Sequence, residues 1–113
     1  MNSLEEARRI INEVDEKMAE LFCARMRAVE TVCAYKMEHG LPILDEAREA
    51  EVIRRNSERV DDEVLREYYV QFLTGNMALS RAYQDRMMHG RPVDGSDSYY
   101  RPAMPTGLCN DIK

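Results

Sequence analysis

The chain has 113 residues, of which 33% are charged, and it carries a formal net charge of −5 at pH 7. A chain of this length has room for one domain and buries a smaller share of its surface than a larger chain does. The acidic balance gives no global electrostatic support for binding nucleic acid or an anionic membrane surface. We therefore expect neither as a partner, and any anion must bind in a local pocket.

The sequence also bears on compartment and metal chemistry. No apolar run approaches the roughly 18 residues that indicate a membrane span, and the first residues are acidic rather than signal-like, which favours a cytoplasmic protein. Cys23, Cys33 and Cys109 show neither CxxC nor Cys/His ligand spacing. We therefore expect reduced structural thiols, with no disulfide framework and no metal site.

The N-terminal third of the chain predicts one long helix. Between Ser3 and His39 there is no proline or glycine, and apolar residues recur at helical spacing. Ser3 with Glu6 is typical of a capping box, and Gly40 followed by Pro42 is a stop signal. Such a helix would be about 55 Å long, whereas a small domain spans only ~30 Å. The helix needs a partner along its length, which predicts a homodimer.

Two shorter helices follow. The second is predicted to begin at the cap Asp45 and to end at about Arg59. The third is predicted from about Asp62 to His89, with Gly90 as its terminator. Its core candidates are the apolar residues at helical spacing, namely Leu65, Tyr68, Tyr69, Phe72, Leu73, Met77 and Met87.

The composition changes after the third helix. Three of the four prolines fall within residues 91–113, in a Gly/Ser/Asp-bearing segment without periodicity. We therefore expect a helical domain over residues 1–90 and a disordered tail over residues 91–113, which could dock another protein.

Two cations interrupt the apolar face of the long helix. Arg25, Val29, Val32 and Lys36 follow 3-4 spacing, so both cations share a face with two valines. A single long cationic side chain can reach water from such a position. For either residue alone, a solvated side chain is as good an interpretation as a bound anion. Two cations buried together without an anion would repel each other and each lose its hydration, so the pair favours a bound anion.

Other polar residues allow two interpretations. Arg8 lies about 25 Å from Arg25 along one helix, so it could serve only the pocket of an antiparallel partner, or it could form a surface ion pair. Ser80 and Gln84 share a face with Leu73 and Met77 on the third helix, where they are either core residues satisfied by backbone or part of a ligand cage. A third group, which suits either helix capping or a binding site, comprises Asp45, Arg48 and Glu49.

The order and spacing of these residues resemble the helical, AroQ-class chorismate mutases from about Leu4 to Gln84. Any one element would be a weak signal, because arginine and lysine are common in helices, but the ordered set is specific. The matching elements are Arg8 six residues before Val14-Asp15-Glu16-Lys17, Arg25 within Ala24-Arg25-Met26-Arg27, Lys36, Pro42-Ile43-Leu44-Asp45, Arg48-Glu49, and Ser80 with Gln84.

The resemblance implies an all-α, three-helix subunit in an intertwined homodimer that converts chorismate to prephenate in aromatic amino acid biosynthesis. Arg25, and Arg8 from the partner chain, would hold the two carboxylates with help from Ser80. Lys36 and Gln84 would address the ether oxygen. The reaction is an intramolecular Claisen rearrangement and needs no cofactor. The other implied site residues are Asp45 and Glu49 at the ring hydroxyl, Arg48 beside them, and Val32, Val52 and Met77 as apolar walls.

Three other functions compete with this one. The first is an isochorismate pyruvate lyase, an enzyme with a similar fold. Glu49 opposes it, because this residue matches the mutase acid that meets the ring hydroxyl of chorismate. A non-catalytic helical dimerisation or regulatory module predicts no binding of small dicarboxylates. A helix-turn-helix DNA-binding protein is opposed by the acidic balance. If the chain is a mutase, its tail could dock another shikimate-pathway protein.

Overall fold

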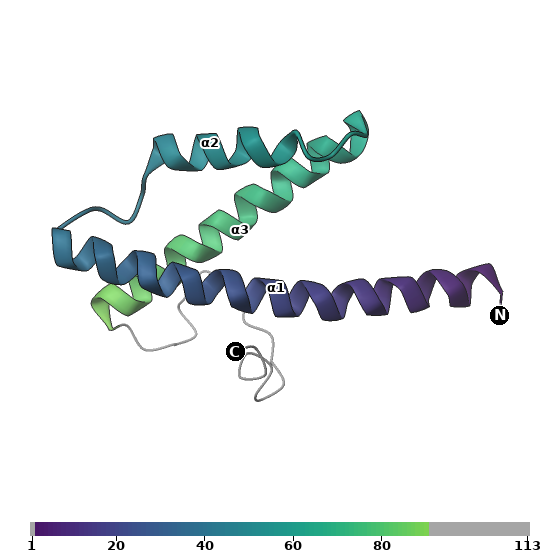
Figure 1. Cartoon of the computed structure of the whole chain (residues 1–113), viewed down its shortest axis with the longest axis horizontal. Coiled ribbons are helices and arrows are strands. Elements are labelled where there is room, and N and C mark those ends of the chain that lie inside the picture. Colours follow the sequence, from purple (N-terminus) through teal and green to yellow (C-terminus); the bar gives the residue numbers. More distant parts are fainter. Residues whose placement is uncertain (1, 91–113) are drawn as a thin grey trace. The chain divides into compact units, whose positions relative to one another are not determined.

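The computed structural model of the chain describes residues 2–90, which form three α-helices (Figure 1). Helix α1 spans Ser3–His39, α2 spans Glu46–Ser57 and α3 spans Glu63–His89. The described residues contain no strand, so the predicted all-α subunit with a long first helix is confirmed. The predicted tail, residues 91–113, lies outside the described residues.

The N-terminal cap of α1 lies one residue earlier than predicted. The side-chain oxygen of Asn2 accepts a hydrogen bond from the backbone N–H of Glu5 at 2.8 Å, and the Asn2 amide donates to the Glu5 carboxylate at 3.4 Å. The N-cap is therefore Asn2, and the prediction of Ser3 with Glu6 is wrong by one residue. Asparagine caps a helix as well as serine does, and the adjacent Asn2 was not considered as a cap.

The C-terminal end of α1 follows its predicted stop signal. Gly40 has a left-handed φ of 64°, a conformation that glycine adopts without steric cost. The Leu41 N–H bonds the Lys36 carbonyl at 2.8 Å, and the Gly40 N–H bonds the Met37 carbonyl at 3.5 Å. These two bonds are a Schellman motif, which satisfies the last carbonyls of the helix.

The ends of α2 and α3 also follow local signals. Asp45 caps α2 by accepting from the Arg48 N–H at 3.0 Å, and Asp62 caps α3 by accepting from two backbone N–H groups. Gly90, with φ of 59°, ends α3 in the left-handed conformation. The predicted boundaries of both helices are confirmed to within two residues, since α2 ends at Ser57.

The chain divides into two compact units within α1, after Glu30. The described part of the first unit, residues 2–30, is the N-terminal section of α1. Its apolar residues are largely open to solvent, with Leu4 56%, Val14 46% and Leu21 69% exposed. None of the helices among the described residues is long and apolar enough to cross a membrane.

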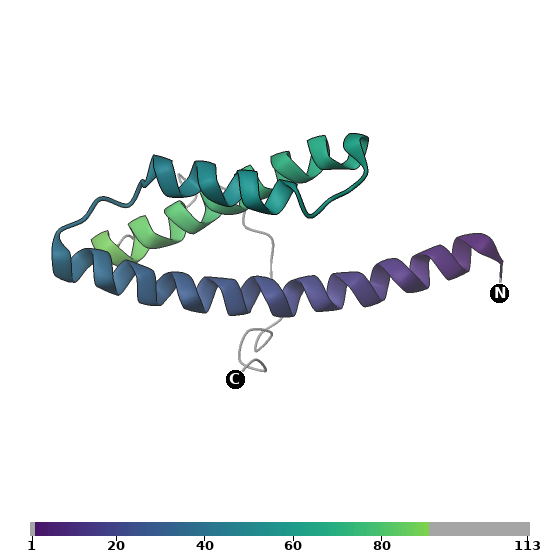
Figure 2. The same ribbon diagram turned by 45° about the horizontal axis from the view of Figure 1, so that its top comes forward.

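The second unit, as far as it is described, holds the end of α1 together with α2 and α3 (Figure 2). Helices α2 and α3 run in opposite directions and are joined by residues 58–62. The apolar core is small and consists of Leu73 and Met77 from α3 and Cys33 from α1. Two polar side chains, Ser80 and Gln84, continue the buried stripe of α3.

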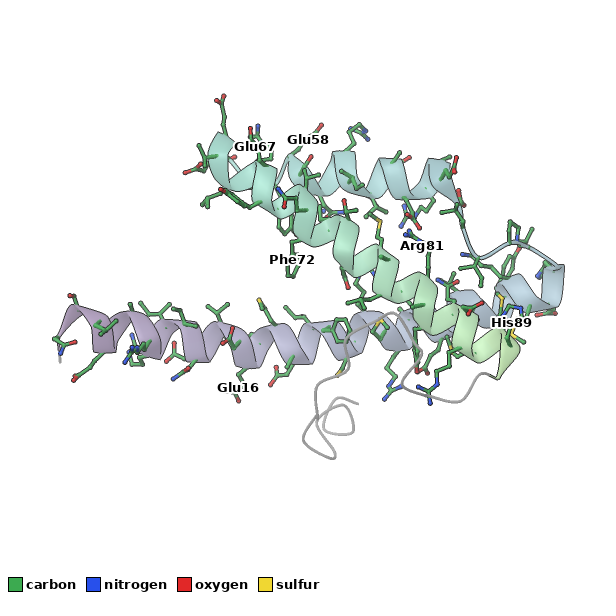
Figure 3. All side chains as sticks on the ribbon, turned by 180° about the vertical axis from the view of Figure 1, so that it is seen from behind. Glu16, Glu58, Glu67, Phe72, Arg81 and His89 are labelled. Carbon is green, nitrogen blue, oxygen red and sulfur yellow. The ribbon has the colours of Figure 1, made fainter. Side chains whose placement is uncertain are left out.

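Several predicted core residues of α3 are not buried within the subunit. Leu65, Tyr68 and Phe72 are 59%, 64% and 55% exposed, which corrects their assignment to the core of one chain. Phe72 projects from α3 on the side away from α2 (Figure 3). Helical periodicity shows that residues share a face, but it does not show which neighbour covers that face.

The cysteines also correct one expectation. Cys33 is a free, buried thiol, as expected, whereas Cys23 is disulfide-bonded. Cys109 lies outside the described residues. Spacing along the chain reveals only motifs of neighbouring cysteines, so it did not predict that Cys23 is bonded.

Candidate active site

Lys36 is the cation at the centre of the candidate site in the second unit. Its half-buried ammonium donates to the backbone carbonyl of Ile43 at 2.6 Å and to the side-chain oxygen of Gln84 at 3.2 Å. Both acceptors are neutral, so these bonds orient the ammonium without cancelling its charge. An ammonium carries three N–H groups, and one therefore remains to meet a ligand.

Gln84 is buried, with 5% of its surface exposed. Its Oε1 accepts from Lys36, while its Nε2 donates to the Ser80 carbonyl of the preceding turn at 3.3 Å. The hydrogen bonds assign the amide orientation, because an ammonium can only donate. The amide nitrogen is therefore the end of Gln84 that can donate to a ligand, and its second N–H is available for that purpose.

Cys33 ties the end of α1 to α3 behind this pair. Its thiol donates to the Gln84 backbone carbonyl at 3.7 Å, and the side chain is 1% exposed. Burial raises the pKa of the Cys33 thiol, an effect that the nearby Lys36 charge partly opposes. The thiol is thus neutral at neutral pH, and its hydrogen bond links the two helices. The sequence signal that could have identified this contact is the position of Cys33, three residues before Lys36 on the same helix.

Ser80 lies on the same buried stripe as Gln84, one turn earlier. Its side chain is 6% exposed, and its hydroxyl donates to the Asn76 carbonyl at 3.0 Å. This bond to the backbone of its own helix agrees with the first of the two interpretations of Ser80, a polar core residue satisfied by backbone. A hydroxyl oxygen also accepts hydrogen bonds, and this group can turn toward a ligand.

The start of α2 places three charged residues within one turn. Asp45 is exposed, and its carboxylate caps α2, which confirms the predicted cap. The Arg48 side chain is exposed. Glu49 is half-buried and forms an ion pair with Arg81 of α3. The role of Arg81 could not be predicted from spacing, because its partner is 32 residues away on another helix.

The remaining predicted residues are distributed over the two units. Arg8 is exposed and Arg25 is half-buried, and both belong to the first unit. Of the three predicted apolar wall residues, Met77 is buried, Val52 is half-buried and Val32 is 47% exposed. The structure therefore brings together Lys36 and Gln84 with Ser80 beside them. Among the described residues there is no group of three or more side chains that could hold a metal ion.

These features are those of a helical protein that binds a small anion. Within residues 2–90 the chain is helical, and its buried polar side chains are the amide of Gln84 and the hydroxyl of Ser80, next to an ammonium whose described acceptors are both neutral. Such groups bind and stabilise negative charge on a small molecule.

Comparison with known families agrees with this description. A family model described as chorismate mutase type II matches residues 7–85, which is more than half of the chain. The chain therefore belongs to the chorismate mutase type II family, as its ordered polar residues had indicated. Neither the curated proteins nor the solved structures include a significant match to it.

Proposed function

We propose that the chain is a chorismate mutase, an isomerase that rearranges chorismate to prephenate in aromatic amino acid biosynthesis. The observation that carries the proposal is the contact between Lys36 and Gln84. An ammonium and an amide from two helices lie 3.2 Å apart, each with an N–H left to donate. Membership of the chorismate mutase type II family supports the same activity.

The chemistry matches what these two groups can supply. In the rearrangement one carbon–oxygen bond breaks as one carbon–carbon bond forms within the same molecule, and no proton is transferred. Negative charge grows on the ether oxygen as the bond lengthens. Lys36 and Gln84 can each donate a hydrogen bond to that oxygen, and both bonds strengthen as the charge develops. A nucleophile and a general base are unnecessary.

The other predicted residues would hold the substrate in its reactive conformation. We assign the two substrate carboxylates to Arg25 and to Arg8 of a partner chain, with Ser80 assisting. Clamping both carboxylates favours the compact conformer from which the bond can form. The residues assigned to the ring hydroxyl and its surroundings are Asp45, Glu49 and Arg48, and those assigned to the apolar walls are Val32, Val52 and Met77.

The cross-subunit role of Arg8 requires a homodimer, which the exposed apolar residues of the first unit support. Ile11, Met18 and Leu21 recur along this part of α1 and are 54%, 44% and 69% exposed. An apolar stripe of this kind is stabilised when another helix covers it. A second copy of α1 is the partner we propose.

Mixing two inactive variants tests this dimer. Arg8→Ala and Arg25→Ala chains should each be inactive alone, but a mixed dimer has one site that contains both arginines. Refolding the two together should therefore restore activity to a fraction of the wild-type level. Well-folded mixed dimers without activity would contradict the role of Arg8 across the interface.

The activity itself is tested by following the loss of chorismate absorbance and identifying the product by chromatography. Lys36→Ala should lower kcat/KM by at least about 10²-fold, or roughly 3 kcal/mol. Lys17→Ala, which removes an exposed lysine of the same helix, is the matched control and should change little. Pyruvate release from isochorismate would favour the lyase. Inactivity of a folded dimer toward both substrates would favour the non-catalytic module.

A further inference from the structure

The ion pair between Glu49 and Arg81 differs from the other ion pairs of the structure. It joins α2 to α3, whereas the other ion pairs seen between described residues link positions three or four apart in the sequence. It is also among the less exposed, since the Glu49 and Arg81 side chains are 24% and 34% exposed. Figure 3 shows Arg81 in the space between the two helices.

The pair lies next to the residues of the candidate site. Arg81 directly follows Ser80 and precedes Gln84 by three residues, a rise of about 4.5 Å along α3. Glu49 lies one turn after the cap Asp45 at the start of α2. The ion pair therefore joins α2 to α3 about one turn of α3 before Gln84, the residue that accepts a hydrogen bond from Lys36 of α1.

The geometry leaves part of Glu49 available. The Arg81 guanidinium contacts the Oε1 atom of the carboxylate, so the Oε2 atom can still accept a hydrogen bond. A hydroxyl group of a ligand is a suitable donor to that oxygen. The guanidinium also offsets a negative charge that would otherwise repel a ligand carrying two carboxylates.

We propose that Arg81 is a positioning residue that fixes the Glu49 carboxylate for the ring hydroxyl of the substrate and reduces its repulsion of the dianion. This inference rests on the proposed chorismate mutase function. Arg81 acts through Glu49 and does not itself contact the reacting atoms. A purely structural tie between α2 and α3 is the competing explanation, and it predicts that loss of Arg81 lowers stability and kcat without a selective rise in KM.

Loss of Arg81 should act mainly on substrate binding. Without the guanidinium, Glu49 keeps its negative charge and gains rotamer freedom, and both effects weaken binding of a dianion before the bond begins to break. An effect shared by ground state and transition state raises KM and leaves kcat nearly unchanged. We expect Arg81→Met to raise KM by about tenfold and to lower kcat by less than about threefold.

A double-mutant cycle tests whether Arg81 acts through Glu49, and the comparison of KM with kcat separates positioning from a structural tie. The variants are Arg81→Met, Glu49→Gln and the double variant, each assayed for kcat and KM with chorismate. If Arg81 acts through Glu49, Arg81→Met should change KM by less than about twofold in the Glu49→Gln background. Arg81→Lys, which keeps the charge, should recover most of the loss. Arg54→Met is the matched control, since it removes an arginine paired with Glu58 at the exposed end of α2.

The outcomes are distinguishable from failure of the proposed function. If the wild-type protein is active and Arg81→Met raises KM equally with and without Glu49→Gln, the role of Arg81 is refuted and the proposed function stands. Absence of turnover by folded wild-type protein overturns the proposed function and this inference with it. If circular dichroism shows that Arg81→Met loses helicity, Arg81→Gln in the same two backgrounds gives the decisive comparison.

Discussion

Replacing Gln84 by glutamate tests whether this side chain donates a hydrogen bond during the reaction. The substitution is nearly isosteric, but it exchanges a neutral amide for a group that donates only when protonated. The carboxyl group of Gln84→Glu would be buried to the same 5% exposure and would lie 3.2 Å from the Lys36 ammonium. Burial raises the pKa of such a carboxyl group, whereas the ammonium lowers it.

The size of the effect follows from the loss of one preorganised donor. Below its pKa the carboxyl group of Gln84→Glu can donate, and the variant should retain activity. Above that pKa, kcat/KM should fall about tenfold for each pH unit. The fall should stop about 10²- to 10³-fold below wild type, which is the usual cost of removing one such donor. The wild-type rate should be nearly flat across neutral pH, because an amide does not titrate there.

The assay is the pH dependence of kcat/KM for chorismate from about pH 5 to pH 8, with helicity followed by circular dichroism. Gln71→Glu, the same change at an exposed position of α3, is the matched control and should keep the flat profile. A Gln84→Glu profile as flat and as high as that of wild type would refute the donor role. So would a steep loss of wild-type activity above neutrality with the fold intact.

Two further predictions concern the core around the site. Met77→Ala, at a position 5% exposed, should lower the free energy of unfolding by about 2–5 kcal/mol in urea titrations. The control Met37→Ala, at a position 54% exposed, should lower it by less than about 0.5 kcal/mol. Equal losses in the two variants would contradict the assigned core. Cys33 should react with iodoacetamide far more slowly in the folded chain than in urea, as measured by mass spectrometry of its peptide, because the thiol is buried and its pKa is raised. The stability due to the protonated Cys33 thiol is complete below the ordinary thiol pKa and is lost as the pH rises through the raised value. Rapid alkylation of folded protein at neutral pH would show that Cys33 is accessible.

The helices could be predicted from sequence because their boundaries are set by local interactions. Gly40 and Gly90 adopt left-handed backbone conformations, and Asp45 and Asp62 cap the helices that follow them. Each signal involves residues within a few positions of one another, so it can be read without knowing the tertiary fold. The one-residue error at Asn2 arose where two good caps are adjacent.

The inward position of Ser80 and Gln84 could also be predicted, because both follow the helical spacing of Leu73. What the sequence could not provide were contacts between distant segments. The pairing of Arg81 with Glu49 depends on how α3 crosses α2, and no spacing rule encodes that crossing. The exposure of α3 residues that were assigned to the core depends likewise on which neighbour covers each face.

The connection between α1 and α2 is closed by the side chain that we propose for catalysis. The Lys36 carbonyl accepts from Leu41 at 2.8 Å, while the Lys36 ammonium reaches forward to the Ile43 carbonyl at 2.6 Å. One residue therefore bonds both sides of the same turn, two positions before the cap of α2. The length of this connection is limited by the reach of a single lysine side chain. Insertions and deletions here would displace the ammonium from Gln84 even if every helix still formed, so in related chains we expect the loop length to vary less than the loop sequence.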